Sequence, residues 1–384
     1  MEGSVAARNS VRKGRAALLR RAVRQLHLWL GTSVGLLLAL IGLTGALLVF
    51  AEPLVKWQAP QLFHDAGPGE WRPISEWQKS AEEKYPDLKP LAFMYGTGTI
   101  PMPTGTPIFF AMTKKNGHER HTLIPVDPVA GKVLDRVDAE DTVAGLLVIF
   151  HKELLAHEVG ILIVAIAGVI GLVSVLSGIY LWWPRRGNWS SGFRFRRGAK
   201  GAAFLYDLHS VPGIWVLIPL SLALFSGVYL QKDEWVDPIV GVFSPVREPD
   251  FTKIVSSPVG ACPAETGIDD AVRLAKQGRE DQVVRLLWGP HTPTGVYKVE
   301  LRKPDANTRA EGTTVYVDRN CPRVIEVAAV ETMTGGERFK GSMWPLHADL
   351  MLGVFGQALV FLAGLALPLM FITGVWFWLK TRRR

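Results

Sequence analysis

The stretch that decides the fold is LHLWLGTSVGLLLALIGLTGALLVF, residues 26–50. It carries no Asp, Glu, Lys or Arg, and it exceeds the roughly 20 apolar residues that a helix needs to cross a bilayer. The same charge-free, apolar character is found in four windows, at about 27–50, 159–183, 209–230 and 350–379. The sequence therefore predicts a membrane protein with four spans, and it excludes a soluble enzyme and a disordered chain.

Basic residues are concentrated beside these windows. Residues 1–26 contain seven Lys and Arg, residues 184–208 contain six, and residues 380–384 contain four, against only Glu2 and Asp207 as acids. Because an excess of Lys and Arg marks cytoplasmic segments, all three are predicted to lie inside. Nucleic-acid binding is the rival interpretation of the basic runs and of the pI of 9.5, and their position beside spans argues against it.

This topology divides the chain into nine segments. The predicted cytoplasmic segments are 1–26, 184–208 and 380–384, the spans are 27–50, 151–183, 209–230 and 346–379, and the outside segments are 51–150 and 231–345. Both termini are therefore expected in the cytoplasm, and the protein is expected to cross the membrane several times.

The two halves of the chain carry the same span motifs. The pattern L-H-x3-G-x12-[ST]-G begins at Leu26 and again at Leu208. The pattern H-x8-G-x16-[ST]-G-x3-W begins at His151 and again at His347. Two gap-free matches in the same order predict an internal duplication.

Each outside segment has the pattern of a helix followed by antiparallel strands. The expected helices are 75–85 and 269–277, and the expected strands are 107–113, 121–126, 283–288, 295–302 and 313–318. Turn residues are found at Asn116-Gly117 and at 127–131. The fold class is thus predicted as a mainly α membrane protein, a four-helix bundle with two small α+β modules outside.

Four of the nine histidines occupy matched positions at the span ends. The topology places His27 and His209 near the inner face and His151 and His347 near the outer face. Facing pairs of neutral imidazoles suit a six-coordinate haem iron held between helices. The rival interpretations are interfacial histidines without a ligand, or a zinc or copper site, for which the spans offer no third ligand.

Small residues accompany these histidines. Each of the four spans carries a glycine near its histidine and an [ST]-Gly pair further on; these residues are Gly31, Gly160, Gly213, Gly356, Thr44-Gly45, Ser177-Gly178, Ser226-Gly227 and Thr373-Gly374. They are expected to thin the helices so that a flat macrocycle can approach. His157 is a reserve ligand, because six residues turn a continuous helix by about 600° and aim it away from the side of His151.

The two cysteines, Cys262 and Cys321, both fall in the second outside segment. An oxidising compartment permits a disulfide between them, and two separate buried thiols are the alternative. No C-x-x-C-H sequence is present, which excludes covalently attached haem. No G-x-G-x-x-G or phosphate-binding loop is present either, so electrons would come from a membrane quinol or a separate reductase.

These motifs resemble the PepSY-associated transmembrane family, also called iron-regulated membrane proteins. The resemblance rests on LHLWLG (26–31), LTGALLVF (43–50), SGIYLWWPRR (177–186), DLHSVPG (207–213), PLH (345–347) and TGVWFW (373–378). Within the family the chain looks most like the FoxB-type ferric-siderophore reductases. The resemblance implies a bacterial inner membrane, PepSY-like periplasmic modules and haem b, of which two are expected. It also implies that His27, His209, His151 and His347 are the axial ligands of the iron.

The function expected on this basis is a reductase that passes electrons across the bilayer to a ferric siderophore in the periplasm, releasing Fe(II). Membrane lipid, the siderophore and an electron donor are the expected partners. The alternative is a membrane-anchored PepSY protein that binds peptide or regulates a protease without redox activity. A transporter is disfavoured, because the interiors of the spans hold no acidic residue and the spans have no proline-broken pair in matching positions.

Overall fold

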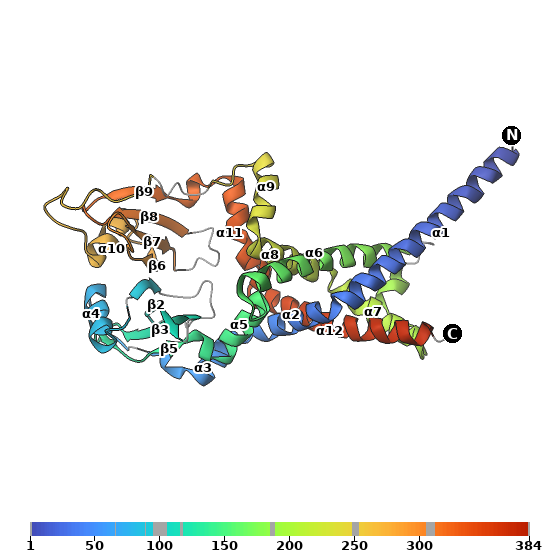
Figure 1. Cartoon of the computed structure of the whole chain (residues 1–384), viewed down its shortest axis with the longest axis horizontal. Coiled ribbons are helices and arrows are strands. Elements are labelled where there is room, and N and C mark those ends of the chain that lie inside the picture. Colours follow the sequence, from blue (N-terminus) through green and yellow to red (C-terminus); the bar gives the residue numbers. More distant parts are fainter. Residues whose placement is uncertain are drawn as a thin grey trace. The chain divides into compact units, whose positions relative to one another are not determined.

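The computed structural model describes residues 2–65, 67–88, 90–94, 106–115, 118–184, 189–247, 253–304 and 312–382. It divides into two compact units, each treated by itself below. The helical unit comprises residues 1–49, 147–233 and 346–384, and the sheet unit comprises residues 50–146 and 234–345. Figure 1 labels the elements of both. The predicted turn at Asn116-Gly117 lies outside the described residues.

The helical unit is built from long apolar helices in matching order in the two halves. Its helices are α1 (Glu2–Ser33), α2 (Gly35–Leu48), α5 (Val143–Glu153), α6 (His157–Trp182), α7 (Ala202–Trp215), α8 (Leu217–Gln231), α11 (Gly335–Asp349) and α12 (Gly353–Arg382), with the 3-10 turn η3 (Trp189–Phe193). The helices α5 and α11 begin in the sheet unit and end in the helical unit. Helix α12 packs along α2 and α7, and α6 packs along α8 and α1. Residues 2–26 of the predicted cytoplasmic tail belong to α1.

Two helices among the described residues, α6 and α12, are each long and apolar enough to cross a membrane. Residues Gly14–Ser33 of α1 with α2, and α7 with α8, form two bent pairs with angles of 60° and 67°. If each bent pair is one span, the number of candidate spans rises to four. The structure therefore supports a mostly helical membrane protein with two to four spans.

The bends fall at equivalent residues of the two halves, Val34 and Val216. Before the first bend, the hydroxyl of Ser33 donates to the carbonyl of Trp29 at 2.7 Å, a side-chain bond that competes with the helix ladder and bends helices. Before the second, Pro212 lies inside α7 and removes one ladder donor. Different residues thus produce the same bend.

A second pair of breaks separates α5 from α6 and α11 from α12. Left-handed backbone angles occur at Leu154, Leu155 and His157 in the first break, and at Leu350, Met351 and Gly353 in the second. Glycine closes each turn, since a Cβ on Gly160 would lie 1.6 Å from the carbonyl oxygen of Glu153, and one on Gly356 would lie 1.5 Å from that of Asp349. His151 and His157 are therefore on different helices, and the predicted 600° rotation between them does not apply.

The described residues of the sheet unit form nine strands and four helices, with 3-10 turns between them. Its elements are α3 (Ala51–Gln58), α4 (Ile74–Lys84), α9 (Asp237–Phe243), α10 (Ile268–Lys276), η1 (Pro60–Leu62), η2 (Ala139–Asp141), η4 (Asp233–Trp235), η6 (Val330–Thr332), β1 (Pro90–Met94), β2 (Ile108–Lys115), β3 (His118–Asp127), β4 (Lys132–Val133), β5 (Val137–Asp138), β6 (Val283–Trp288), β7 (Val296–Arg302), β8 (Gly312–Asp318) and β9 (Val324–Ala328). Every helix and strand predicted in the outside segments is present within two to three residues of its expected bounds.

All strand pairs are antiparallel and follow the order β4-β3-β2-β1-β6-β7-β8-β9, with β5 on β3. Strand β1 joins the two halves, because Ala92 pairs with Phe110 of β2 on one side and with Trp288 of β6 on the other. The two outside segments were predicted as two modules, and the pairing of their first strands was not foreseen.

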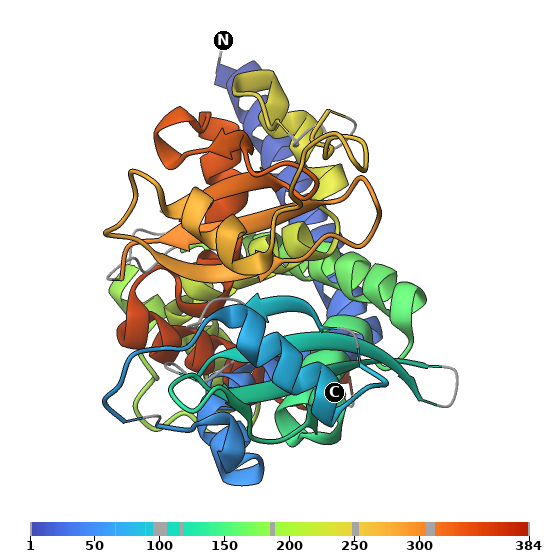
Figure 2. The ribbon, with the colours of Figure 1, turned by 90° about the vertical axis from the view of Figure 1, so that its left-hand side faces the viewer.

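The helices α4 and α10 lie on one face of this sheet (Figure 2). Trp77 of α4 and Ala271 of α10 are buried against alternate residues of the central strands, such as Phe109, Leu287 and Val315. Because successive side chains of a strand point to opposite faces, one apolar residue in two is enough to build this core. The alternating pattern that predicted the strands is therefore also the pattern that packs them.

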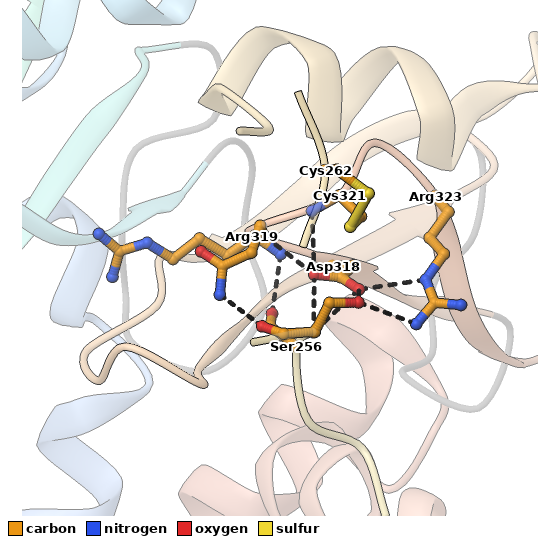
Figure 3. Close-up of a disulfide and its surroundings, with 8 residues drawn as sticks. Ser256, Cys262, Asp318, Arg319, Cys321 and Arg323 are labelled. Atoms are coloured by element: carbon orange, nitrogen blue, oxygen red, sulfur yellow. Dashed lines mark hydrogen bonds and ion pairs between the residues drawn. A yellow bond between two sulfur atoms is a disulfide. The ribbon is translucent and has the colours of Figure 1, made fainter. Parts of the chain in front are cut away.

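Cys262 and Cys321 form a disulfide, which decides between the two alternatives that the sequence left open. It closes the loop before α10 onto the turn after β8, where Asp318 is fully buried (Figure 3). The carboxylate of Asp318 accepts hydrogen bonds from the Ser257 hydroxyl at 2.7 Å, from the Asn320 amide at 2.9 Å and from Arg323 at 3.1 Å. Burial alone would raise the pKa of Asp318, but these bonds lower it to about 2.

Asp127 occupies the equivalent turn after β3 in the first half. Its carboxylate accepts hydrogen bonds from the amides of Val129 and Ala130 and lies 3.1 Å from Nε2 of His64. Burial works against ionisation here too, and the bonds from Ala130, His64 and Val129 lower the pKa of Asp127 below its usual value. Both turns thus use one carboxylate, fully buried at Asp318 and partly buried at Asp127, to hold the preceding linker.

Candidate functional site: two histidine pairs

The structure brings together His27 and His209, the pair predicted near the inner face. His27 is on α1 and His209 is on α7, so each half of the chain supplies one ring. The ring centroids are 6.1 Å apart and the rings are nearly perpendicular, at 87°.

The pair predicted near the outer face is also together. His151 lies near the end of α5 and His347 near the end of α11. Their ring centroids are 6.0 Å apart, with an angle of 51° between the rings. This pair again combines one residue from each half of the chain.

A backbone carbonyl of a neighbouring helix anchors each histidine at Nδ1. His27 lies 3.1 Å from the oxygen of Ser174, and His209 lies 2.9 Å from that of Met370. His151 lies 2.9 Å from the oxygen of Ile41, and His347 lies 3.0 Å from that of Ala223. A carbonyl only accepts, so each Nδ1 carries the proton and donates it, and the lone pair stays on Nε2.

The [ST] residue of each [ST]-Gly pair lies beside the same Nδ1 atom. The hydroxyl oxygen of Ser177 is 2.8 Å from Nδ1 of His27, and that of Ser226 is 3.1 Å from Nδ1 of His347. The hydroxyl oxygens of Thr44 and Thr373 lie 3.3 Å and 3.4 Å from Nδ1 of His151 and His209.

The glycine that follows makes room for the ring. A Cβ on Gly45 would lie 2.8 Å from Cε1 of His151. The corresponding distances to Cε1 of the neighbouring histidine are 3.3 Å for Gly178, 3.1 Å for Gly227 and 3.2 Å for Gly374. The four [ST]-Gly pairs therefore seat imidazoles, whereas the sequence interpretation assigned them to the approach of a macrocycle.

The earlier glycines of the spans also differ from that interpretation. Gly160 and Gly356 close the turns before α6 and α12, as described above. Gly213 faces Met370, and Gly31 has no other atom within 4 Å of an added Cβ. Two other glycines, Gly42 and Gly364, do let two helices approach closely. An added Cβ on either residue would lie within 2.8 Å of the other's carbonyl oxygen.

Three other histidines have different surroundings. His157, the reserve ligand, is exposed at the first residue of α6 with φ of 49°. Its equivalent is Gly353, which also has positive φ, so the position serves a turn. His64 contacts Asp127, and Nδ1 of His121 contacts Glu140 at 2.6 Å in the sheet unit.

The two pairs lie at different levels of the helices. His209 contacts the carbonyl of Met370 on α12. His151 contacts the carbonyl of Ile41 on α2, beside the point where α2 approaches Gly364 of α12. The six residues from Gly364 to Met370 correspond to about 9 Å along α12, so the anchoring carbonyls of the two pairs are at separate levels.

The pairs fit the ligation of a haem iron. A metal–imidazole bond is about 2 Å long and the ring centre lies about 1 Å beyond the nitrogen, so two imidazoles on opposite sides of one metal have centres about 6 Å apart. The observed separations are 6.1 and 6.0 Å. Two nitrogens alone do not complete a zinc site, and no cluster of three His, Cys, Asp or Glu is found among the described residues.

An ion pair between exposed Arg196 and buried Asp207 fixes the basic loop next to His209. Asp207 lies two residues before His209, is buried, and accepts from Nε and Nη2 of Arg196 at 2.9 and 2.7 Å. The backbone amide of Arg196 donates to the same carboxylate at 3.0 Å. This pair was missed at the sequence level, where Asp207 was counted only as an isolated acid among basic residues.

No curated protein matches the chain significantly. The family model of the PepSY-associated TM region matches residues 24–381, which include all four paired histidines. The chain therefore belongs to the PepSY-associated transmembrane family.

Proposed function

We propose that this protein is a haem b-containing inner-membrane reductase of the FoxB type. It takes electrons from a quinol or a separate reductase and delivers them to a ferric siderophore in the periplasm, which releases Fe(II). The observation that carries the proposal is the pairing of four histidines at two levels, each with Nδ1 bound and Nε2 left for a metal.

His27 and His209 would hold one haem, and His151 and His347 the other. Bound haem supplies a centre that accepts and donates one electron without a proton. The chain's own contribution is preorganisation: the carbonyls of Ser174, Met370, Ile41 and Ala223 fix each tautomer and each ring. Such outer contacts raise the basicity of a metal-binding histidine and hold its orientation.

The topology belongs to the same proposal. The basic segments place both termini and residues 184–208 in the cytoplasm. Each bent pair then counts as one span, and the four spans form a bundle. The equivalent bends, breaks and histidine anchors of the two halves support an internal duplication, in which each haem is held between the copies.

The test is the ultraviolet–visible spectrum of the detergent-purified protein, oxidised and then reduced with dithionite, with a pyridine haemochrome count. We expect a Soret band, a sharp reduced α-band and about two haems per chain. Oxidation of the reduced protein by a ferric siderophore, followed by trapping of Fe(II) with a chelator, tests the substrate.

Each outcome separates the competing functions. One haem per chain would leave one pair structural and break the proposed path across the bilayer. A colourless protein from cells supplied with haem precursor would exclude the redox function. The membrane-anchored PepSY protein that binds peptide or regulates a protease would then be the better account. A haem protein that the siderophore fails to oxidise would keep the relay and reject the substrate.

A further inference from the structure

The helix α9 exposes a continuous apolar side. Ile239, Val242 and Phe243 are 63%, 79% and 86% exposed, and Trp235 in the preceding turn is 40% exposed. Within α9, Val242 and Phe243 follow Ile239 by three and four residues, which places these three residues on one side of the helix. No charged residue of α9 shares this side, because Asp237 is directed to an ion pair.

The opposite side of α9 is fixed on α11. Nζ of Lys340 contacts the carboxylate of Asp237 at 3.2 Å, and the amide of Gly336 donates to the hydroxyl of Ser244 at 3.0 Å. A Cβ on Gly336 would lie 2.5 Å from the carbonyl oxygen of Ser244, which shows how closely the two segments approach. The apolar side cannot turn toward α11 and bury itself there.

A second set of bonds holds the segment after α9. Nε and Nη2 of Arg247 contact the two carboxylate oxygens of Glu337 at 3.0 and 3.1 Å, and the hydroxyl of Thr334 donates to the carbonyl of Pro245. Burial disfavours the charge of Glu337, but the bonds from Arg247 and Thr334 lower its pKa. The orientation of α9 on α11 is therefore set at both of its ends.

The chain keeps α9 close to the end of a candidate span. Helix α8, the second part of a bent pair, ends at Gln231, and α9 begins at Asp237. Six steps of extended chain cover at most about 20 Å. The helix α11, to which α9 is bound, leads within four residues into α12, the second long apolar helix.

We propose that α9 is an interfacial membrane helix, whose side formed by Ile239, Val242 and Phe243 lies in the leaflet where α8 leaves the bilayer. Short helices with one apolar and one polar side lie in the plane of the interface, and Trp235 is a residue type enriched at headgroup level. The partner is lipid because the side is uncharged and adjoins a span. This inference rests on the membrane spans and is independent of haem.

The first half of the chain offers the corresponding feature. Helix α3 begins three residues after α2 ends, and its Trp57 is 77% exposed. Both halves thus place a short helix with an exposed large apolar residue directly after a bent pair.

The experiment places a fluorescent probe on α9 and asks whether lipid reaches it. Because both native cysteines are in the disulfide, a single Phe243→Cys substitution can be labelled selectively in the full chain. The labelled protein is reconstituted into vesicles whose lipids carry a quencher at the headgroup or along the acyl chain. Glu280→Cys, at an exposed and charged turn of the same unit, is the matched control.

We expect loss of most of the Phe243→Cys probe signal with the shallow acyl-chain quencher and none for the Glu280→Cys probe. A probe at position 243 that is quenched only by a water-soluble quencher would overturn the proposal. A probe shielded from both quenchers, with cross-linking between two copies through position 243, would also overturn it and assign this side to a second copy of the chain. The haem spectrum of both labelled proteins, recorded in parallel, keeps this outcome separate from the proposed function.

Discussion

The hydroxyl oxygen of Ser177 lies 2.8 Å from Nδ1 of His27, although 150 residues separate them in the sequence. The same hydroxyl donates to the carbonyl of Ser174, which is also the acceptor of His27. One turn of α6 therefore fixes both the protonation and the direction of the imidazole. The equivalent arrangement recurs at the other three histidines, so the [ST]-Gly pair acts as a histidine anchor.

The anchor predicts a graded response to loss of the hydroxyl. Ser177→Ala should keep both haems, because the carbonyl of Ser174 still accepts from His27. Loss of an outer contact weakens metal binding by roughly 10- to 100-fold, and the loss of haem affinity in Ser177→Ala should be smaller than this. Thr44→Val should have a smaller effect, since its hydroxyl oxygen is 3.3 Å from Nδ1 of His151. Haem titration of the two apoproteins measures the difference. A larger effect at Thr44 would contradict the ranking by distance.

The pairing of residues from different halves predicts a pattern of non-additivity. His27→Ala and His209→Ala should each remove one haem, and the double variant should remove no more than either alone. His27→Ala combined with His347→Ala should remove both haems, because these residues belong to different pairs. The number of haems per chain in each variant is measured by the pyridine haemochrome count. His157→Ala is the control and should retain two haems. Loss of a second haem from the His27→Ala, His209→Ala variant would disprove the assignment of partners.

Much of this arrangement followed from the sequence, for physical reasons. Strands depend on alternation and short amphipathic helices on helical spacing, so β6 and α10 were predicted to within one residue. The histidine pairs followed from the repeat and the topology. The anchoring carbonyls could not be predicted, because a backbone acceptor leaves no mark on residue type.

The breaks in the helices were missed for a related reason. Leu154, Leu155, Leu350 and Met351 adopt left-handed angles, and none of these residue types favours them. These turns bring the ends of α5 and α11 to their histidine contacts, so tertiary structure overrides local preference there. The β1–β6 pairing was likewise set by contacts between distant segments.

The glycine contacts predict different tolerance at two equivalent positions. Gly45→Ala places a Cβ 2.8 Å from Cε1 of His151, so the ring must move, whereas the Cβ of Gly178→Ala lies 3.3 Å from Cε1 of His27. We expect Gly45→Ala to lose most of one haem and Gly178→Ala to retain two. The haemochrome count of both variants, compared at equal protein concentration, provides the measurement. Retention of two haems by Gly45→Ala would contradict this prediction, because it would show that the imidazole of His151 can accommodate the added Cβ.

The disulfide predicts a stability effect confined to the sheet unit. The bond closes a loop with a sequence separation of 59, for which chain entropy gives a stabilisation of at most about 4 kcal/mol. Cys262→Ser with Cys321→Ser should therefore lower resistance of residues 253–345 to proteolysis while leaving the haem spectrum unchanged. Limited proteolysis with fragment mapping, with and without reductant on the unaltered chain, checks this. A changed haem spectrum would show that the disulfide also supports the histidine pairs.

Buried Asp318 predicts acid sensitivity of the same unit. Its pKa is about 2 in the folded state, against a usual value of 3.8, so the ionised form is favoured by folding. A depressed carboxyl pKa stabilises the fold fully above the unfolded value, and this contribution declines as the pH falls from about 4 to about 2. Thermal unfolding of the purified protein should show decreasing stability across this window. Asp318→Asn should be less stable at neutral pH and should lose part of the acid slope, while Asp127, whose pKa is also lowered, sustains the remainder. An unchanged slope in Asp318→Asn would show that other carboxylates carry the whole effect.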